Sequence, residues 1–140
     1  MNFWDTSAFI EAHDRLSPVF VRALGLLRQK TLQAASALIQ PEAIATMTRR
    51  LKPDDAAVDA ACDLIRNSLA HLDLLAVDGA VLESSMEIAR RTGLKGSDSI
   101  HLATALIAAR EMGRRSFVFL TLDRAMGTAA RNRGLRVVLG

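Results

Sequence analysis

Short apolar segments alternate with longer helical segments along the whole of this 140-residue chain. Strands are expected at residues 3–4, 31–36, 72–77, 117–121 and 135–139. Apolar residues between the strands recur at helical spacing. Helices are therefore expected at residues 8–13, 17–30, 37–51, 53–69, 78–92, 98–112 and 123–134. Strands that alternate with helices predict parallel strands in one sheet, with helices on both faces. We therefore expect a single α/β domain over residues 1–140.

The composition suits helices packed on such a sheet, because half of the residues are hydrophobic and only 4% are aromatic. The single Cys62 cannot form an intramolecular disulfide, which favours a reducing compartment. We see neither a secretory signal nor an apolar run that could span a membrane, so a cytoplasmic protein is expected. The net charge is +3, and 15 of the 18 basic residues are Arg, whose guanidinium suits phosphate contact.

The first predicted strand leads directly into a polar triplet, Asp5, Thr6 and Ser7. This order places a carboxylate at the carboxyl edge of the sheet, where ligands bind in open α/β folds. The same residue types also cap helices, so the triplet taken alone favours Asp5 as the N-cap of the helix that follows. A ligand site would require other carboxylates that are placed to join Asp5.

Three more carboxylates are placed to join Asp5. Asp123 follows the fourth predicted strand, Glu42 follows the second, and Asp98 opens the helix that leads to the fourth strand. Because the carboxyl ends of parallel strands share one edge, these acids can meet, although each also has an ordinary role as a cap or a solvated residue. Four acids gathered without a cation would repel one another, and oxygen-only ligands select Mg²⁺ or Mn²⁺.

Four motifs, in this order, make the chain resemble a PIN domain. They are Phe-Trp-Asp-Thr-Ser-Ala at residues 3–8, Glu42, Gly-Ser-Asp-Ser-Ile-His-Leu-Ala-Thr-Ala at residues 96–105, and Phe-Leu-Thr-Leu-Asp at residues 119–123. The chain is most similar to the VapC-type ribonuclease toxins of prokaryotic toxin–antitoxin pairs. The resemblance covers essentially the whole chain, and the segment around Asp98 is its most specific part.

The resemblance implies a three-layer α/β/α sandwich with a central parallel sheet of about five strands. It also implies a metal-dependent endoribonuclease that hydrolyses RNA phosphodiester bonds with water activated by Mg²⁺ or Mn²⁺. The expected catalytic residues are Asp5, Glu42, Asp98 and Asp123, and the expected metal ligands are Asp5, Asp98 and Asp123. Thr6, Ser7 and Thr121 are expected to support these carboxylates. The implied partners are RNA, a small antitoxin, and a second copy of the chain in a homodimer or a toxin–antitoxin hetero-oligomer.

Several features leave room for other interpretations. Pro41 directly precedes Glu42, where the family more often has a residue that favours a helix, so the direction of the Glu42 side chain is open. His101 lies one turn after Asp98 and suits either a phosphate contact or, more simply, a packed histidine. The candidates for RNA backbone contact are Arg49, Arg50, Lys52, Arg90, Arg91, Arg114 and Arg115.

Two alternative functions were weighed against the nuclease. One is a PIN-like RNA- or protein-binding module with weak or no catalysis, which the complete set of four acids disfavours. The other is a phosphatase of the haloacid-dehalogenase type, which also begins with a strand followed by Asp-x-Thr. That chemistry needs a second Asp two residues after the first, and Ser7 occupies this position.

Overall fold

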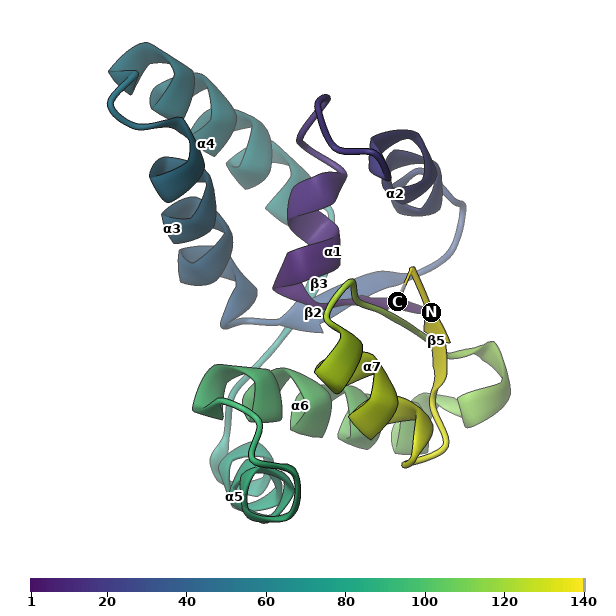
Figure 1. Ribbon diagram of the computed structural model, residues 1–140. Coiled ribbons are helices and arrows are strands. Elements are labelled where there is room, and N and C mark those ends of the chain that lie inside the picture. Colours follow the sequence, from purple (N-terminus) through teal and green to yellow (C-terminus); the bar gives the residue numbers. More distant parts are fainter. Residues whose placement is uncertain (140) are drawn as a thin grey trace.

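A computed structural model describes residues 1–139, and within them five parallel strands form one sheet in the order β3-β2-β1-β4-β5 (Figure 1). The strands are β1 (Asn2–Trp4), β2 (Gln33–Ser36), β3 (Asp73–Leu75), β4 (Val118–Leu120) and β5 (Arg136–Val138). The strand β1 lies at the centre and pairs with β2 on one side and β4 on the other. The predicted parallel sheet of five strands is confirmed.

Helices cover both faces of the sheet and complete the predicted three-layer sandwich (Figure 1). One layer holds α1 (Thr6–Glu11), α2 (Phe20–Leu27), α3 (Ile39–Leu51) and α4 (Asp55–Leu69). The other layer holds α5 (Gly79–Thr92), α6 (Gly96–Met112) and α7 (Arg124–Arg131), and a 3₁₀ turn at Arg114–Ser116 precedes β4. Every helix in the described chain is too short or too polar to cross a lipid bilayer.

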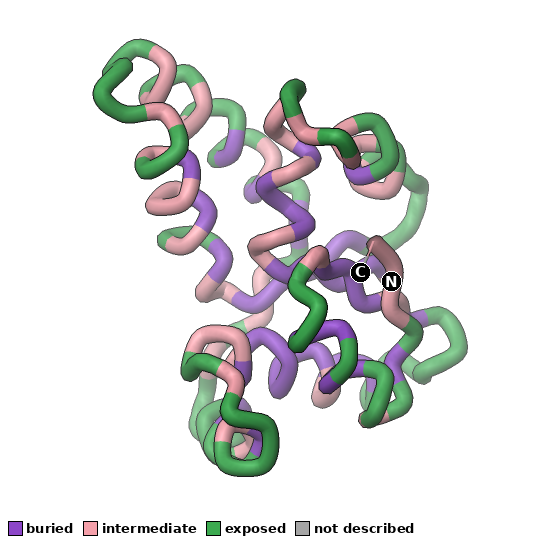
Figure 2. The backbone as a smooth tube through the Cα atoms, in the orientation of Figure 1, coloured by how far each residue is buried: buried purple, intermediate pink, exposed green. Residues whose placement is uncertain are grey.

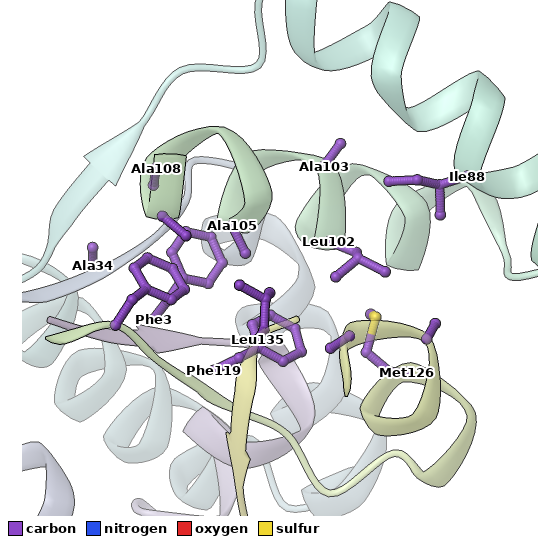
Figure 3. Packing of buried hydrophobic residues seen from close by; sticks show 14 of the residues in the cluster. Phe3, Ala34, Ile88, Leu102, Ala103, Ala105, Ala108, Phe119, Met126 and Leu135 are labelled. Atoms are coloured by element: carbon purple, nitrogen blue, oxygen red, sulfur yellow. The ribbon is translucent and has the colours of Figure 1, made fainter. Parts of the chain in front are cut away.

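The core is divided in two by the sheet, because successive strand residues point to opposite faces. Phe3 packs toward α5–α7, where its ring stacks on Phe119 with centroids 6.0 Å apart (Figure 3). Trp4 packs on the opposite face and meets Phe9 edge-on, at 6.2 Å between centroids. Between α5 and the sheet, α6 is buried over most of its length (Figure 2), which explains why apolar residues occur all around it.

Most elements are shorter in the structure than the sequence predicts, and two of the differences have a clear physical reason. Pro18 suits the first position of a helix, but the second helix begins only at Phe20. Instead, the Ser17 hydroxyl accepts a hydrogen bond from the Val19 N–H at 3.2 Å, which forms a turn before the helix. The third strand, expected to be buried over residues 72–77, is limited to three partly exposed residues because β3 lies at the edge of the sheet.

Two residue assignments in the second half of the chain were wrong. The helical spacing of Leu82 predicts a core residue, but it is 44% exposed, because α5 buries Val81, Ser85 and Ile88 instead. The sequence predicts Ser97 as the cap of the next helix, but α6 begins at Gly96 with Lys95 as its N-cap. It also predicts that Asp78 caps α5 and that Gly93 ends it; both are confirmed, and Gly93 adopts the left-handed conformation with φ of 71°.

A histidine links α1 to α4. The two ring nitrogens of His13 contact the Phe9 carbonyl at 2.8 Å and the Ser68 hydroxyl at 2.7 Å. A neutral ring satisfies both contacts, with one nitrogen donating to the carbonyl and the other accepting from the hydroxyl. Burial lowers the pKa of His13 below its ordinary value of 6.5, although the hydrogen bond to Phe9 acts in the opposite direction.

We expect the stability of the protein to fall as the pH falls below about 6.5. In that range the unfolded chain binds a proton at His13 more readily than the folded chain, so stability is lost as the pH falls through the folded-state pKa. Urea unfolding at about pH 7.5 and about pH 5.5 measures this loss. His13→Leu should weaken the dependence, whereas His71→Leu, which removes an exposed imidazole, should retain it. An unchanged dependence in His13→Leu would contradict the prediction.

Candidate functional site

The strand order creates a topological switch point beside β1. The chain runs from β1 outward to β2 and β3, then returns to place β4 and β5 on the other side of β1. In open α/β sheets, ligands bind at such a point, outside the carboxyl ends of the strands. Asp5 directly follows β1, and Asp123 lies three residues after β4. The Asp5 N–H donates to the Leu120 carbonyl at 2.9 Å, which fixes the two strand ends together.

A pocket of about 260 Å³ opens at this point, and all four predicted acids line it. Asp5 comes from the end of β1, Glu42 from the start of α3, Asp98 from the first turn of α6, and Asp123 from the N-cap of α7. The remaining lining residues are Thr6, Ser7, Ile10, Thr46 and Arg50. Four segments far apart in the sequence thus contribute one carboxylate each to a shared cavity.

The geometry at Asp5 tests whether its side chain is a helix cap. Asp5 occupies the N-cap position of α1, but within the described chain its side chain accepts no capping hydrogen bond. Instead, Oδ2 accepts hydrogen bonds from the Ser7 hydroxyl at 2.7 Å and the Thr121 hydroxyl at 2.8 Å. Asp5 is 3% exposed. The capping alternative therefore does not describe Asp5, whereas Asp123 does cap α7, through the Met126 N–H at 2.9 Å.

The two hydroxyls beside Asp5 also hold the backbone that follows β4. Ser7 Oγ accepts a hydrogen bond from the Leu122 N–H at 3.0 Å, and Thr121 Oγ1 accepts one from the Asp123 N–H at 3.1 Å. Each hydroxyl thus donates to Asp5 and accepts from the chain near Asp123. This arrangement fixes the separation of the two strand exits and the direction in which Asp5 points.

Glu42 is directed by contacts from two other elements. Pro41 is the third residue of α3, where its missing N–H breaks no helical hydrogen bond. Glu42 Oε1 accepts a hydrogen bond from the Thr6 hydroxyl at 3.0 Å and contacts Nε2 of His101. Burial raises the pKa of Glu42, but His101, Thr6 and Ser97 together lower it below the ordinary value. Glu42 is therefore ionised at neutral pH, and Pro41 does not turn it away from the pocket.

Asp98 is the pocket acid whose pKa is raised by its surroundings. Burial raises the pKa of Asp98 above its ordinary value, and the negative charges of Asp5, Asp123 and Glu42 raise it further, against an opposing effect of His101. Among residues 1–139, no hydrogen bond or ion pair to its side chain is found. A cation in the pocket would relieve this repulsion.

The donor set fits a hard divalent cation in charge and in chemistry. The four acidic residues of the pocket offer carboxylate oxygens, and Mg²⁺ and Mn²⁺ prefer oxygen ligands. In the part of the chain that the structure describes, no three His, Cys, Asp or Glu side chains are already close enough to hold one ion together.

The sequence matches the family model of the PIN domain over residues 3–132, and the chain belongs to this family. PIN domains are generally nucleases and typically use divalent metal ions, so membership supports a hydrolase of nucleic acid. A crystal structure of FitAcB from Neisseria gonorrhoeae has a similar fold, with a TM-score of 0.69 and 20% sequence identity. The alignment covers 98% of this chain and 96% of that chain. No curated protein sequence matches the chain significantly.

The position of Arg50 in the pocket was not predicted from the sequence. Arg50 lines the pocket and forms ion pairs with Glu11 at 2.7 Å and Asp14 at 3.0 Å. The sequence singled it out only as one of seven basic residues that could contact RNA, because its acidic partners lie more than 30 residues earlier in the chain. The contact between His101 and Glu42 was missed for the same reason, although the spacing of His101 from Asp98 placed it near the site.

Proposed function

We propose that this protein is a metal-dependent endoribonuclease of the VapC type, the toxin of a toxin–antitoxin pair. The observation that carries the proposal is the pocket at the switch point, which takes one carboxylate from each of four distant segments. Membership of the PIN family supports nuclease chemistry, and the resemblance of the motif around Asp98 supports the toxin class.

In the proposed mechanism, Asp5, Asp98 and Asp123 hold one or two Mg²⁺ or Mn²⁺ ions. Such an ion, when bound by these residues, would lower the pKa of a water molecule and offset the charge that develops on the phosphate. Asp5 is held in a fixed orientation by Ser7 and Thr121, so it presents its carboxylate without a reorientation cost. Glu42 orients the attacking water or accepts its proton, because it is kept ionised beside the metal ligands.

The direct test is cleavage of an end-labelled RNA of mixed sequence by the purified chain with MnCl₂. A DNA of the same sequence is the comparison for substrate class. New RNA ends that appear within the strand support an endoribonuclease. RNA binding without cleavage would instead favour the alternative, a PIN-like module with weak or no catalysis.

A groove between α5 and α7 suits the sugar-phosphate backbone of the RNA. It has a volume of about 610 Å³ and contains three guanidinium groups, those of Arg91, Arg124 and Arg133. Arg91 pairs with Glu87, whereas neither Arg124 nor Arg133 forms an ion pair with any residue of the described chain. Arg124 directly follows Asp123, so a strand that leaves the acidic pocket along α7 would pass these cations. Arginine is well suited to such phosphate contacts.

We expect Arg124→Gln combined with Arg133→Gln to weaken RNA binding and its dependence on salt. Each lost phosphate contact on a single strand reduces the slope of log K against log salt by about 0.7, so the double variant should lose about 1.4. Fluorescence anisotropy in EDTA measures binding without cleavage. Arg22→Gln removes an exposed charge from α2, on the opposite layer, and should leave the slope unchanged. If Arg22→Gln reduces the slope by the same amount, the prediction that RNA binds in this groove is wrong.

The proposed protein partners are a small antitoxin and a second copy of the chain. A candidate surface for docking or dimerisation is the apolar face of the second helix, formed by Val19, Phe20, Ala23, Leu24 and Leu27. Ala23 is fully buried and Leu27 packs against the core, so part of this face belongs to the fold itself. Exposed apolar side chains lie nearby at Leu16 and Val21. Size-exclusion chromatography of the chain alone tests the dimer.

A further inference from the structure

His101 is a fully buried histidine that contacts a residue of the acidic pocket. Its side chain is 0% exposed, and Nε2 contacts Oε1 of Glu42 and lies 3.3 Å from the Thr6 hydroxyl. Nδ1 is also buried and has no hydrogen-bond partner among the described residues. All polar contacts of this ring are therefore directed at one place, the Glu42 carboxylate and the hydroxyl beside it.

The contacts define which ring nitrogen carries hydrogen. A carboxylate oxygen only accepts hydrogen bonds, so Nε2 is the protonated nitrogen and donates to Glu42. The Thr6 hydroxyl also donates to Glu42 Oε1, at 3.0 Å, and its oxygen is free to accept from the same Nε2–H. Thr6, Glu42 and His101 form a closed triangle in which both donors reach the same carboxylate oxygen.

We propose that His101 is a positioning residue that holds the Glu42 carboxylate toward the acidic pocket. The inference rests on the proposed nuclease function, in which Glu42 orients or deprotonates the attacking water. Glu42 needs such a partner because its side chain is 28% exposed and would otherwise sample several rotamers. Asp5 has the same arrangement, because one of its carboxylate oxygens also accepts hydrogen bonds from two donors, Ser7 and Thr121.

Three substitutions of His101 separate the effect of its Nε2–H donor from the effect of its size. His101→Gln places an amide N–H near the position of Nε2, whereas His101→Asn is too short to reach Glu42, and His101→Leu supplies no donor. Loss of a partner that orients an active-site ligand typically costs 10- to 100-fold in activity. We expect Asn and Leu to lower kcat for RNA cleavage by about this factor with little change in KM, and Gln to retain most of the wild-type kcat.

A double-mutant cycle tests whether His101 acts through Glu42. If it does, Glu42→Gln and the double variant Glu42→Gln/His101→Leu should have the same kcat, because the partner has no function once the carboxylate is gone. Losses that multiply in the double variant would overturn the inference, as would a His101→Gln variant no more active than His101→Leu. Either result would assign His101 to core packing alone.

Thermal unfolding of the same variants supplies a readout that needs no substrate. The contact predicts coupling, so the melting temperature of the double variant should lie above the value expected from adding the two single shifts. Additive shifts would contradict the contact itself. Absence of RNA cleavage by the wild-type protein would overturn the proposed function, whereas wild-type kcat in His101→Leu would overturn only the role of His101.

Discussion

Asp5→Asn is expected to lower the rate of RNA cleavage by about a thousandfold. The amide is neutral and cannot balance a divalent cation, and a loss of about 4 kcal/mol of transition-state stabilisation corresponds to that factor. The hydrogen bonds around Asp5 add to the effect, because Ser7 and Thr121 both donate to Oδ2 and an amide nitrogen in that place would face two donors. Initial rates on an end-labelled RNA with MnCl₂ measure the change.

Asp54→Asn is the matched control for this experiment. Asp54 is also an aspartate at an N-cap, but it caps α4, away from the pocket, by accepting from the Ala57 N–H at 3.0 Å. Asparagine caps a helix about as well as aspartate, so the control should keep wild-type activity and stability. Asp98→Asn should be as inactive as Asp5→Asn. If both pocket variants cleave RNA at the wild-type rate, the activity comes from a contaminant and the assignment is wrong.

Removal of divalent cations is expected to abolish cleavage, and addition of Mg²⁺ or Mn²⁺ to restore it. Burial and the neighbouring carboxylates raise the pKa of Asp98 in the metal-free protein, and a bound cation would oppose both effects. An ion that binds only the folded state stabilises it by about 2.7 kcal/mol at 100 times its Kd. For a chain of this length, that is a rise in melting temperature of roughly 8 °C.

This second prediction can be checked without RNA. Differential scanning fluorimetry in EDTA, with and without excess MgCl₂, should show the rise for wild type and little or none for Asp98→Asn. Trp4 is the only tryptophan in the chain, is fully buried, and directly precedes Asp5, so its fluorescence offers an independent titration with Mg²⁺. Cleavage that persists in EDTA would contradict the metal-dependent mechanism. A melting temperature indifferent to Mg²⁺ and Mn²⁺ would favour the binding module.

The layers of the fold could be predicted from the sequence because the spacing of apolar residues is a local property of the chain. Alternating strand and helix patterns depend on neighbouring residues, and they predicted the parallel sheet and the convergence of strand exits at one edge. Element boundaries were less predictable, since they depend on contacts that local patterns do not contain. Leu82 has the spacing of a core residue, yet the packing of α5 on α6 selects Ser85 for burial instead.

Prediction of the pocket was limited in the same way. The position of Asp5 after a short strand allowed either a cap or a ligand site, and the contacts that exclude the cap include the hydroxyl of Thr121, 116 residues away in the chain. Pro41 raised a question about Glu42 that depended on where α3 begins, and a start at Ile39 makes the proline harmless. The contact of His101 with Glu42 spans 59 residues and has no local signal.

The pairing of β4 with β1 has a consequence for the chain while it is being synthesised. Within this domain the central strand β1 is synthesised before the other strands, and its neighbour β4 follows more than 110 residues later. A nascent or prematurely terminated chain that lacks residues 118–123 has neither Asp123 nor the Thr121 hydroxyl that orients Asp5. The pocket can therefore be assembled only after residue 123 has been synthesised, and a product that stops before it lacks part of the pocket.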